Sequence, residues 1–266
     1  MEQILLPTDF SETSYKAAVF ALDLFGTEEA RFMLLNAYLK TAYHNALVPL
    51  SVDTERASTN GLRRIAGRCR KHAGKVRIAL RSTYEPLVRA INELDASKHI
   101  DFVVVGTQGE GNYGRVGRNS GAVVTGAVPP VIAVPGEWVP VSIKHILFAD
   151  DGHGITPASM EPLLAIAKRT NARITVMHVG SIQEDKRTKQ YLQELSAGFG
   201  DRPHSFITVE STGVTGELDR LVKERDVQLV AVLKRTRNFW ERMFQGSTSK
   251  RLALHTTVPL LVLRET

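Results

Sequence analysis

The feature that most constrains the fold of this chain is an internal repeat. Four apolar segments of the first half recur in the same order in the second half. The pairs are ILLPTDF and ILFADDG, ARFMLLNAY and ARITVMHVG, DFVVVG and VQLVAVL, and PPVIAVP and VPLLVLR. Such self-similarity marks a duplicated structural unit. We therefore expect two similar domains, residues 1–140 and 141–266.

Within each repeat, apolar strands alternate with helical stretches. The strands read as near-continuous runs of Val, Ile and Leu, which is typical of a parallel sheet buried on both faces. The helical stretches cover residues 14–24, 61–72, 86–94, 121–126, 157–169, 186–195, 215–223 and 248–255, and Ser11 is the expected N-cap of the first. This alternation predicts an α/β fold of two open, mainly parallel sheets with right-handed crossovers. In such sheets ligands bind beyond the carboxyl ends of the strands, where the winding reverses.

Composition sets the remaining limits. No apolar run approaches the roughly 20 residues of a membrane helix, and no secretory leader is evident at the start of the sequence. The only cysteine, Cys69, excludes an intrachain disulfide and fits a reducing, cytoplasmic location. The net charge of +6 is spread over both halves. It would attract a polyanion or phosphorylated ligand, or it simply reflects a solvated basic surface.

The corner after the first strand carries the first candidate site residue. Asp9 would accept hydrogen bonds from a ribose hydroxyl or an adenine amine. Alternatively, its carboxylate caps the following helix, whose first N–H groups favour a negative charge.

A glycine-rich stretch follows the fourth strand of the first half. The segment GTQGEGNYGRVGRNSG holds Gly106, Gly109, Gly111, Gly114, Gly117 and Gly121. Glycines let backbone N–H groups approach an anion, and the helix that begins near Asn119 adds free N–H groups. Arg115 and Arg118 would add charge-assisted bonds. The stretch thus predicts a phosphate cradle, with a flexible surface loop as the alternative; it matches neither a Walker loop nor a dinucleotide fingerprint.

These segments together resemble the universal stress protein family, in a tandem arrangement that covers essentially the whole chain. The resemblance rests on ILLPTDFSETS, on VVVGTQG with its glycine stretch, on PPVIAVP and on the second copies. It implies a Rossmann-like sheet of five parallel strands per domain. It also implies domains that pair through their last strands, here an intrachain pseudo-dimer through residues 131–134 and 260–263, with a homodimer possible through another face. Some members of the family bind ATP and others do not.

The same resemblance implies a nucleotide site in the first domain. Pro7, Thr8 and Asp9 would contact adenine and ribose, and Ala37 stands where the family usually has valine. Gly106 and Gly109 match the first two positions of the family's phosphate motif. The third position falls on Gly117, followed by Arg118, when it is counted back from the last strand. It falls on Asn119-Ser120 when nine intervening residues are kept, so the motif is imperfect either way.

The second domain departs further from the motif. Gly246 and Ser247 fall where Gly-Ser is expected, but Leu233 and Thr236 replace the two leading glycines. Asp150 and Asp151 match the corner of Thr8 and Asp9, and Val179 after His178 resembles the usual end of the second strand. Side chains at the leading glycine positions would crowd a ligand. We therefore expect a vestigial site at Asp150, Asp151, Val179, Gly246 and Ser247.

Two further groups of side chains have alternative interpretations. Phe239, Trp240, Met243 and Phe244 form one stripe of a short helix among Lys234, Arg235, Arg237 and Arg242. The stripe either fills the vacated pocket or forms a docking surface for a partner. The basic run Arg63, Arg64, Arg68, Arg70 and Lys71 reads as a solvated helix face, because nucleic-acid binding would favour interleaved aromatic residues.

No catalytic motif of the common hydrolase or metal types occurs, and we assign no catalytic or metal-ligating residue. The leading hypothesis is a stress-response protein that binds ATP or ADP in the first domain as a structural or signalling ligand, with Mg²⁺ only alongside the nucleotide. The alternative is a nucleotide-free interaction protein of the same fold with an unknown protein partner. Slow ATP hydrolysis is a third and weaker hypothesis. Membrane and nucleic acid are not expected as partners.

Overall fold

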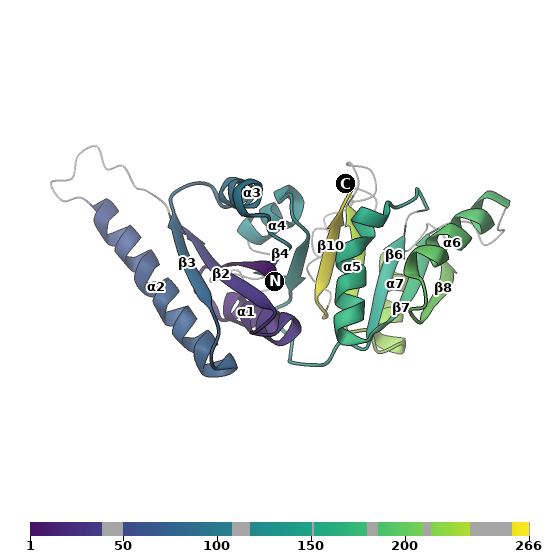
Figure 1. The fold of residues 1–266 in the computed structure, drawn as a ribbon, viewed down its shortest axis with the longest axis horizontal. Helices are drawn as coiled ribbons and strands as arrows, with labels where there is room; N and C mark the ends of the chain where they lie inside the picture. The colour runs from purple at the N-terminus through teal and green to yellow at the C-terminus, as the bar shows by residue number, and fades with distance from the viewer. Residues whose placement is uncertain are drawn as a thin grey trace. The chain divides into compact units, whose positions relative to one another are not determined.

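The structure is a computed structural model that describes residues 1–38, 50–107, 118–150, 152–179, 186–209, 214–234 and 257–265; for residues 50–53, 118, 179, 187, 214 and 215 it describes the backbone only. The chain divides into two compact units, Met1–Gly136 and Glu137–Thr266. Figure 1 shows helices lying against a sheet in each unit.

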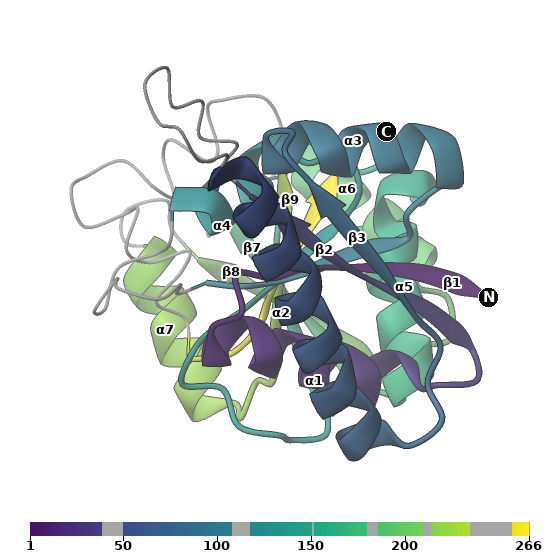
Figure 2. The same ribbon diagram turned by 90° about the vertical axis from the view of Figure 1, so that its left-hand side faces the viewer.

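The first unit is a five-stranded parallel sheet in the order β3-β2-β1-β4-β5. Its elements are β1 (Glu2–Pro7), α1 (Glu12–Phe25), β2 (Ala30–Ala37), α2 (Leu50–Ala73), β3 (Ile78–Thr83), α3 (Leu87–Lys98), β4 (Phe102–Gly106), α4 (Arg118–Gly126) and β5 (Val131–Val134). Helices α1 and α2 pack side by side, as do α3 and α4, and Figure 2 shows α2 lying across β2 and β3. The chain winds outward from β1 through β2 to β3, and it then crosses to the other side of β1 to form β4 and β5.

The second unit repeats this topology in the order β10-β9-β6-β7-β8. Its elements are β6 (His145–Asp150), α5 (Pro157–Thr170), β7 (Arg173–Val179), α6 (Lys186–Phe199), β8 (His204–Val209), α7 (Val214–Glu224), β9 (Leu229–Lys234) and β10 (Leu260–Arg264). The expected α/β fold of two open, mainly parallel sheets is thereby confirmed.

The central strands form the cores of both units. All residues of β4, β5 and β6 are buried, and so are nearly all of β9 and β10. These are the continuous apolar runs that the sequence pattern assigns to a doubly covered parallel sheet. The edge strands β3 and β8 differ, because most of their residues are exposed or half-buried. Their mixed sequences, IALRST and HSFITV, are not among the four repeated segments, so the repeat alone did not locate them.

Helix boundaries follow local capping. Ser11 is the N-cap of α1, and its hydroxyl accepts a hydrogen bond from the backbone N–H of Ser14, as predicted. Thr156 caps α5 in the same way. Helix α2 begins at Leu50, so it is longer than the predicted 61–72. The sequence did not indicate its first turns, because they lie in a polar stretch that lacks apolar periodicity. The predicted helix over 248–255 lies outside the described residues.

Candidate functional site

The winding of the first sheet reverses between β1 and β4. From β1 the chain moves outward to β2, whereas β4 lies on the other side of β1. The carboxyl ends of these strands place Thr8, Asn36 and Thr107 at one edge of the sheet. The backbone N–H of Thr8 bonds to Leu35, and that of Thr107 bonds to Val134, so the strand pairing extends to this edge. This is the position at which open α/β sheets bind ligands.

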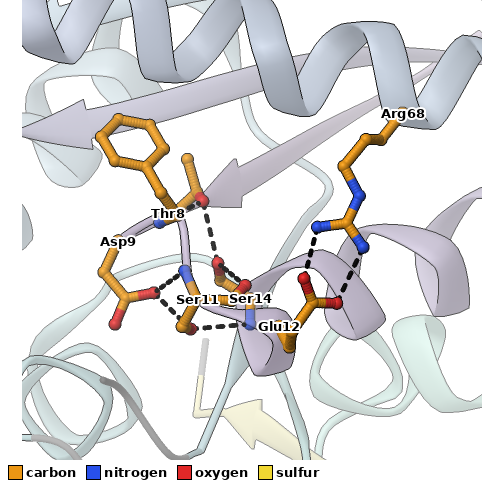
Figure 3. A network of polar contacts seen from close by, with 7 residues as sticks. Thr8, Asp9, Ser11, Glu12, Ser14 and Arg68 are labelled. Atoms are coloured by element: carbon orange, nitrogen blue, oxygen red, sulfur yellow. Dashed lines mark hydrogen bonds and ion pairs between the residues drawn. The ribbon is translucent and has the colours of Figure 1, made fainter. Parts of the chain in front are cut away.

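A chain of hydroxyl groups fixes the corner between β1 and α1 (Figure 3). The hydroxyl of Ser14 donates to the carbonyl of Ser11 at 2.9 Å, and its oxygen lies 2.9 Å from Oγ1 of Thr8. Since the Ser14 proton is already used, Thr8 donates to Ser14. Thr8 Oγ1 in turn accepts the backbone N–H of Phe10 at 3.0 Å. The Thr8 hydroxyl therefore donates one hydrogen bond and accepts one in holding the corner, and one of its two acceptor lone pairs is left unused by the described residues.

Asp9 supports the helix cap rather than being the cap. Its Oδ1 accepts the backbone N–H of Ser11 at 3.1 Å and the Ser11 hydroxyl at 2.6 Å (Figure 3). The side chain is exposed, and its second oxygen, Oδ2, accepts no hydrogen bond from the described residues. Asp9 can therefore serve both predicted roles. One oxygen stabilises the start of the helix, and the other is available to accept hydrogen bonds from a ligand.

A second polar chain connects the edge to α2. The amide of Asn36 donates to the carbonyl of Thr8 at 2.6 Å, and its oxygen accepts the hydroxyl of Ser58 at 2.7 Å. Ser58 also lies 2.6 Å from Ser82 on β3. The groups are neutral, and Asn36 and Ser58 are buried, so this half of the edge is polar without being charged.

Thr107 follows β4 and begins the glycine-rich stretch. It is 2% exposed, yet its hydroxyl oxygen has no hydrogen-bond partner among the described residues. A buried hydroxyl without a partner is unfavourable, by about 1–3 kcal/mol. Next to it, the hydroxyl of Ser120 in the first turn of α4 donates to the carbonyl of Gly106 at 2.6 Å. Ser120 therefore ties the start of α4 to the end of β4.

The corresponding edge of the second unit carries ionisable groups. Asp150 at the end of β6 is 3% exposed, and His178 at the end of β7 is 5% exposed. Nδ1 of His178 donates to Oδ2 of Asp150 at 2.8 Å, and the hydroxyl of Tyr191 on α6 donates to Oδ1 at 2.6 Å. The backbone N–H of Gly152 also donates to Oδ2, at 3.2 Å. Asp150 is thus enclosed by donors of its own unit.

Two cations end the neighbouring strands of the second unit. Lys234 on β9 and Arg264 on β10 are paired in register. Burial lowers the pKa of Lys234 to about 8, with a smaller effect from the charge of Arg264, and burial lowers the pKa of Arg264 to about 10. The first unit has Thr107 and Pro135 at the equivalent ends of β4 and β5. The carboxyl ends of the two sheets therefore have the same backbone arrangement but differ in the side chains that they carry.

Comparison of the sequence with models of known protein families shows to which family the chain belongs. The model described as "Universal stress protein family" matches residues 1–135 and 182–264, which is most of the chain. The chain belongs to the universal stress protein family. This confirms the resemblance found in the sequence.

Individual relatives agree with this assignment. A universal stress protein from Mycolicibacterium smegmatis is 28% identical over 188 residues, which cover 64% of this chain and 64% of that protein, slightly less than two thirds of its length. The crystal structure of a universal stress protein from Archaeoglobus fulgidus matches 99% of this chain and 96% of its own with a TM-score of 0.73 at 18% identity. A functionally unknown protein from Pseudomonas aeruginosa matches 100% and 93%, with a TM-score of 0.63 at 14% identity. At these identities the structural matches establish the tandem fold.

Part of the expected nucleotide site of this universal stress protein lies within the described residues. Pro7 and Thr8 are buried at the edge, and Asp9 is exposed beside them. Ala37 ends β2 and is half-buried, and Asn119 is exposed in the first turn of α4. Gly106 ends β4, where it packs against α1, because a Cβ there would come within 2.7 Å of the Thr13 carbonyl. Its glycine character is thus already required by helix packing.

Other expected site residues lie outside the described residues. In the first unit these are Gly109, Gly117 and the side chain of Arg118; in the second unit they are Asp151, Gly246, Ser247, the side chain of Val179 and the aromatic stripe around Trp240. The basic run on α2 is partly accounted for. Arg63, Arg64, Arg70 and Lys71 are exposed, while Arg68 donates two hydrogen bonds to Glu12 and stacks 3.6 Å from the centre of the Tyr15 ring.

Sequence reasoning missed the polar partners that join distant segments. Ser58 and Tyr191 belong to no motif, and Asn36 and Thr107 lie in quoted segments that did not indicate their contacts. These contacts depend on strand register and helix position. Of the network in the second unit, Asp150 and the histidine at the end of the second repeat's second strand were visible beforehand. Among the described residues, no cluster of three or more His, Cys, Asp or Glu side chains is arranged to hold a metal ion. None of the described helices has the length and apolarity that a membrane crossing requires.

Proposed function

We propose that this universal stress protein binds an adenine nucleotide, ATP or ADP, at the carboxyl edge of the first unit and uses it as a structural or signalling ligand. The observation that carries the proposal is the unpartnered buried hydroxyl of Thr107 beside an exposed Asp9 carboxylate, at the reversal point of the sheet. Both groups offer hydrogen bonds that the described part of the protein leaves unused.

The residues present fit such a ligand in chemical terms. A carboxylate oxygen accepts hydrogen bonds from ribose hydroxyls, and the first turn of α4 offers backbone N–H groups that favour a phosphate. Gly106 and Ser120 hold that turn close to β4. When bound, the nucleotide supplies its phosphate charge and its ribose hydroxyls to this edge. The chain's own contribution is to orient these groups through Thr8, Asp9 and the start of α4.

The second unit is the weaker candidate for the same ligand. Asp150 stands where Thr8 stands in the first unit, and three donors of its own unit already surround it. Leu233 replaces Gly106. We therefore expect the two units of this protein to be unequal, with the first as the nucleotide-binding one.

The direct test is to denature purified protein, remove the precipitate and analyse the supernatant for adenine nucleotides by chromatography. Calorimetry of the nucleotide-free chain with ATP then compares Asp9→Asn with the control Glu28→Ala, an exposed carboxylate in a turn of the same unit. Asn keeps the Oδ1 acceptor for Ser11 and removes the charge, so we expect about tenfold weaker binding with an unchanged fold. No nucleotide in the supernatant and no binding by calorimetry would instead favour a nucleotide-free interaction protein.

A further inference from the structure

The two units fill the space between their first two helices differently. In the first unit, Phe10 adopts φ +69° and its ring lies against α2 at Gly61, where a Cβ would come within 2.5 Å of the ring. The ring therefore occupies the gap between α1 and α2. In the repeat, Gly152 takes the position of Phe10, with a similar φ of +75°. The second unit thus keeps the backbone turn, and Gly152 lies against the His178 ring, because a Cβ there would come within 2.7 Å of it.

A cavity of about 180 Å³ lies between α5 and α6 of the second unit. Its lining residues are Gly154, Ile155, Pro157, Met160, Leu164, Tyr191, Glu194, Leu195 and Gly198. Gly198 on α6 faces the side chain of Met160 on α5. A Cβ at Gly198 would lie 3.5 Å from the sulfur and the methyl carbon of Met160. For comparison, an apolar cavity of roughly 150 Å³ holds one benzene molecule. The space therefore suits a ligand of one ring or a short aliphatic chain.

The lining has one charged member. Five of the side chains are apolar, and the hydroxyl of Tyr191 is engaged by Asp150. Glu194 is exposed at the cavity, and its Oε1 accepts a hydrogen bond from Gln190 at 3.0 Å. Its other oxygen, Oε2, accepts none from the described residues. An apolar space with a carboxylate at its rim is complementary to an apolar group that carries a positive charge.

We propose that the α5–α6 cavity binds a small amphipathic amine, with its apolar part between Met160 and Leu195 and its ammonium group beside Glu194. The wall formed by Tyr191 is held in place beforehand, because its hydroxyl is bonded to Asp150, which His178 also holds. Because this wall is ordered before binding, less conformational entropy is lost when the ligand binds. This site is separate from the proposed nucleotide edge, which lies in the other unit.

The test uses the full-length chain with benzylamine and its uncharged analogue benzyl alcohol, titrated by ligand-detected NMR or calorimetry. We expect saturable binding of one benzylamine per chain and about threefold or more weaker binding of benzyl alcohol. Gly198→Leu should abolish binding by filling the cavity, whereas Ala197→Leu, an exposed neighbour on α6 outside the lining, should leave it unchanged. Glu194→Gln should remove the preference for the amine, whereas Glu161→Gln on the exposed surface of α5 should retain it.

Three outcomes would overturn the proposal. These are no saturable binding of benzylamine at millimolar concentration, equal affinities for the amine and the alcohol in the unaltered chain, or unchanged binding in folded Gly198→Leu. If Gly198→Leu does not fold, the Glu194→Gln comparison decides, because that substitution preserves size and shape. A failure of nucleotide binding would not affect these results, since the probes carry no phosphate or nucleobase.

Discussion

His178 donates its Nδ1 proton to Asp150 at 2.8 Å, at the strand ends where Asn36 meets Thr8 in the first unit. Duplication has thus preserved the position of the contact and changed its chemistry, from amide and hydroxyl to imidazole and carboxylate. Tyr191 on α6 replaces the hydroxyl chain through Ser58 on α2. The second unit therefore has a buried charge fixed by its own donors.

Removing that carboxylate should destabilise the second unit selectively. Asp150→Ala leaves His178 and Tyr191 without their acceptor, and we expect a loss of about 2–3 kcal/mol in the free energy of unfolding. Hydrogen exchange resolved by mass spectrometry should show faster exchange in β6 and β7 and unchanged protection in β1 and β2. Asp201→Ala, in an exposed turn, is the control. Unchanged exchange in β6 would contradict the stabilising role of this network.

Thr107→Val separates ligand binding from folding. Valine has the shape of threonine without the hydroxyl, and that hydroxyl has no partner among the described residues. We expect equal or slightly higher thermal stability, together with ATP binding weakened about fivefold or more if the hydroxyl contacts the ligand. Thr125→Val, whose hydroxyl bonds within the exposed side of α4, is the control for binding. Full ATP affinity in Thr107→Val would remove this residue from the proposed site.

Nucleotide titration should saturate at no more than one ATP per chain. The second unit has Leu233 in place of Gly106 and a fully engaged Asp150 in place of Thr8. Equilibrium dialysis measures the stoichiometry directly. Gly109→Val, at a position outside the described residues, should abolish binding, because a branched side chain would intrude on the phosphate path. Two equivalent sites, or binding that survives this substitution, would refute the inequality of the units.

Two glycines of α2 should respond oppositely to alanine. A Cβ at Gly61 would lie 2.5 Å from the Phe10 ring, whereas one at Gly67 meets nothing within 4 Å. Gly61→Ala should therefore lower the free energy of unfolding by about 1–3 kcal/mol, while Gly67→Ala should raise it by about 0.4–1 kcal/mol. Chemical denaturation followed by circular dichroism tests both. A stabilised Gly61→Ala would show that the Phe10 ring does not occupy the α1–α2 gap.

His145 should make the second unit less stable in mild acid. Its Nδ1 donates to the Arg225 carbonyl at 2.8 Å, and its Nε2 lies 2.7 Å from the Thr175 hydroxyl, so a neutral ring satisfies both contacts. Burial, assisted by the nearby charge of Arg173, lowers the pKa of His145 below its ordinary value. The unfolded chain therefore binds the proton more readily, and stability falls as the pH drops below about 6.5.

The measurement is the free energy of unfolding between pH 7.5 and pH 5 for the unaltered chain and for His145→Asn. Because the chain carries other histidines, the informative quantity is the difference between the two slopes. We expect a shallower decline in His145→Asn. Identical slopes would show that His145 does not contribute to the acid sensitivity.

The sequence by itself determined the α/β class, the duplication and the central strands. These follow from local properties, namely continuous apolar runs for doubly covered strands and Ser11 ahead of a helical stretch. Residues such as Val103 and Val230 are buried because their neighbours in the chain make them part of such runs. The edge strands β3 and β8 were not among the repeated segments, because strands with one solvated side have mixed composition.

Only the tertiary structure decided which polar groups meet. Asp150, His178 and Tyr191 come from three elements, β6, β7 and α6. The α5–α6 cavity likewise results from the packing of two helices that are apart in the sequence. Such contacts depend on strand register and helix position, which join residues far apart in the chain. The apolar pattern of each segment indicates which of its residues are buried, but it does not determine which polar groups come into contact.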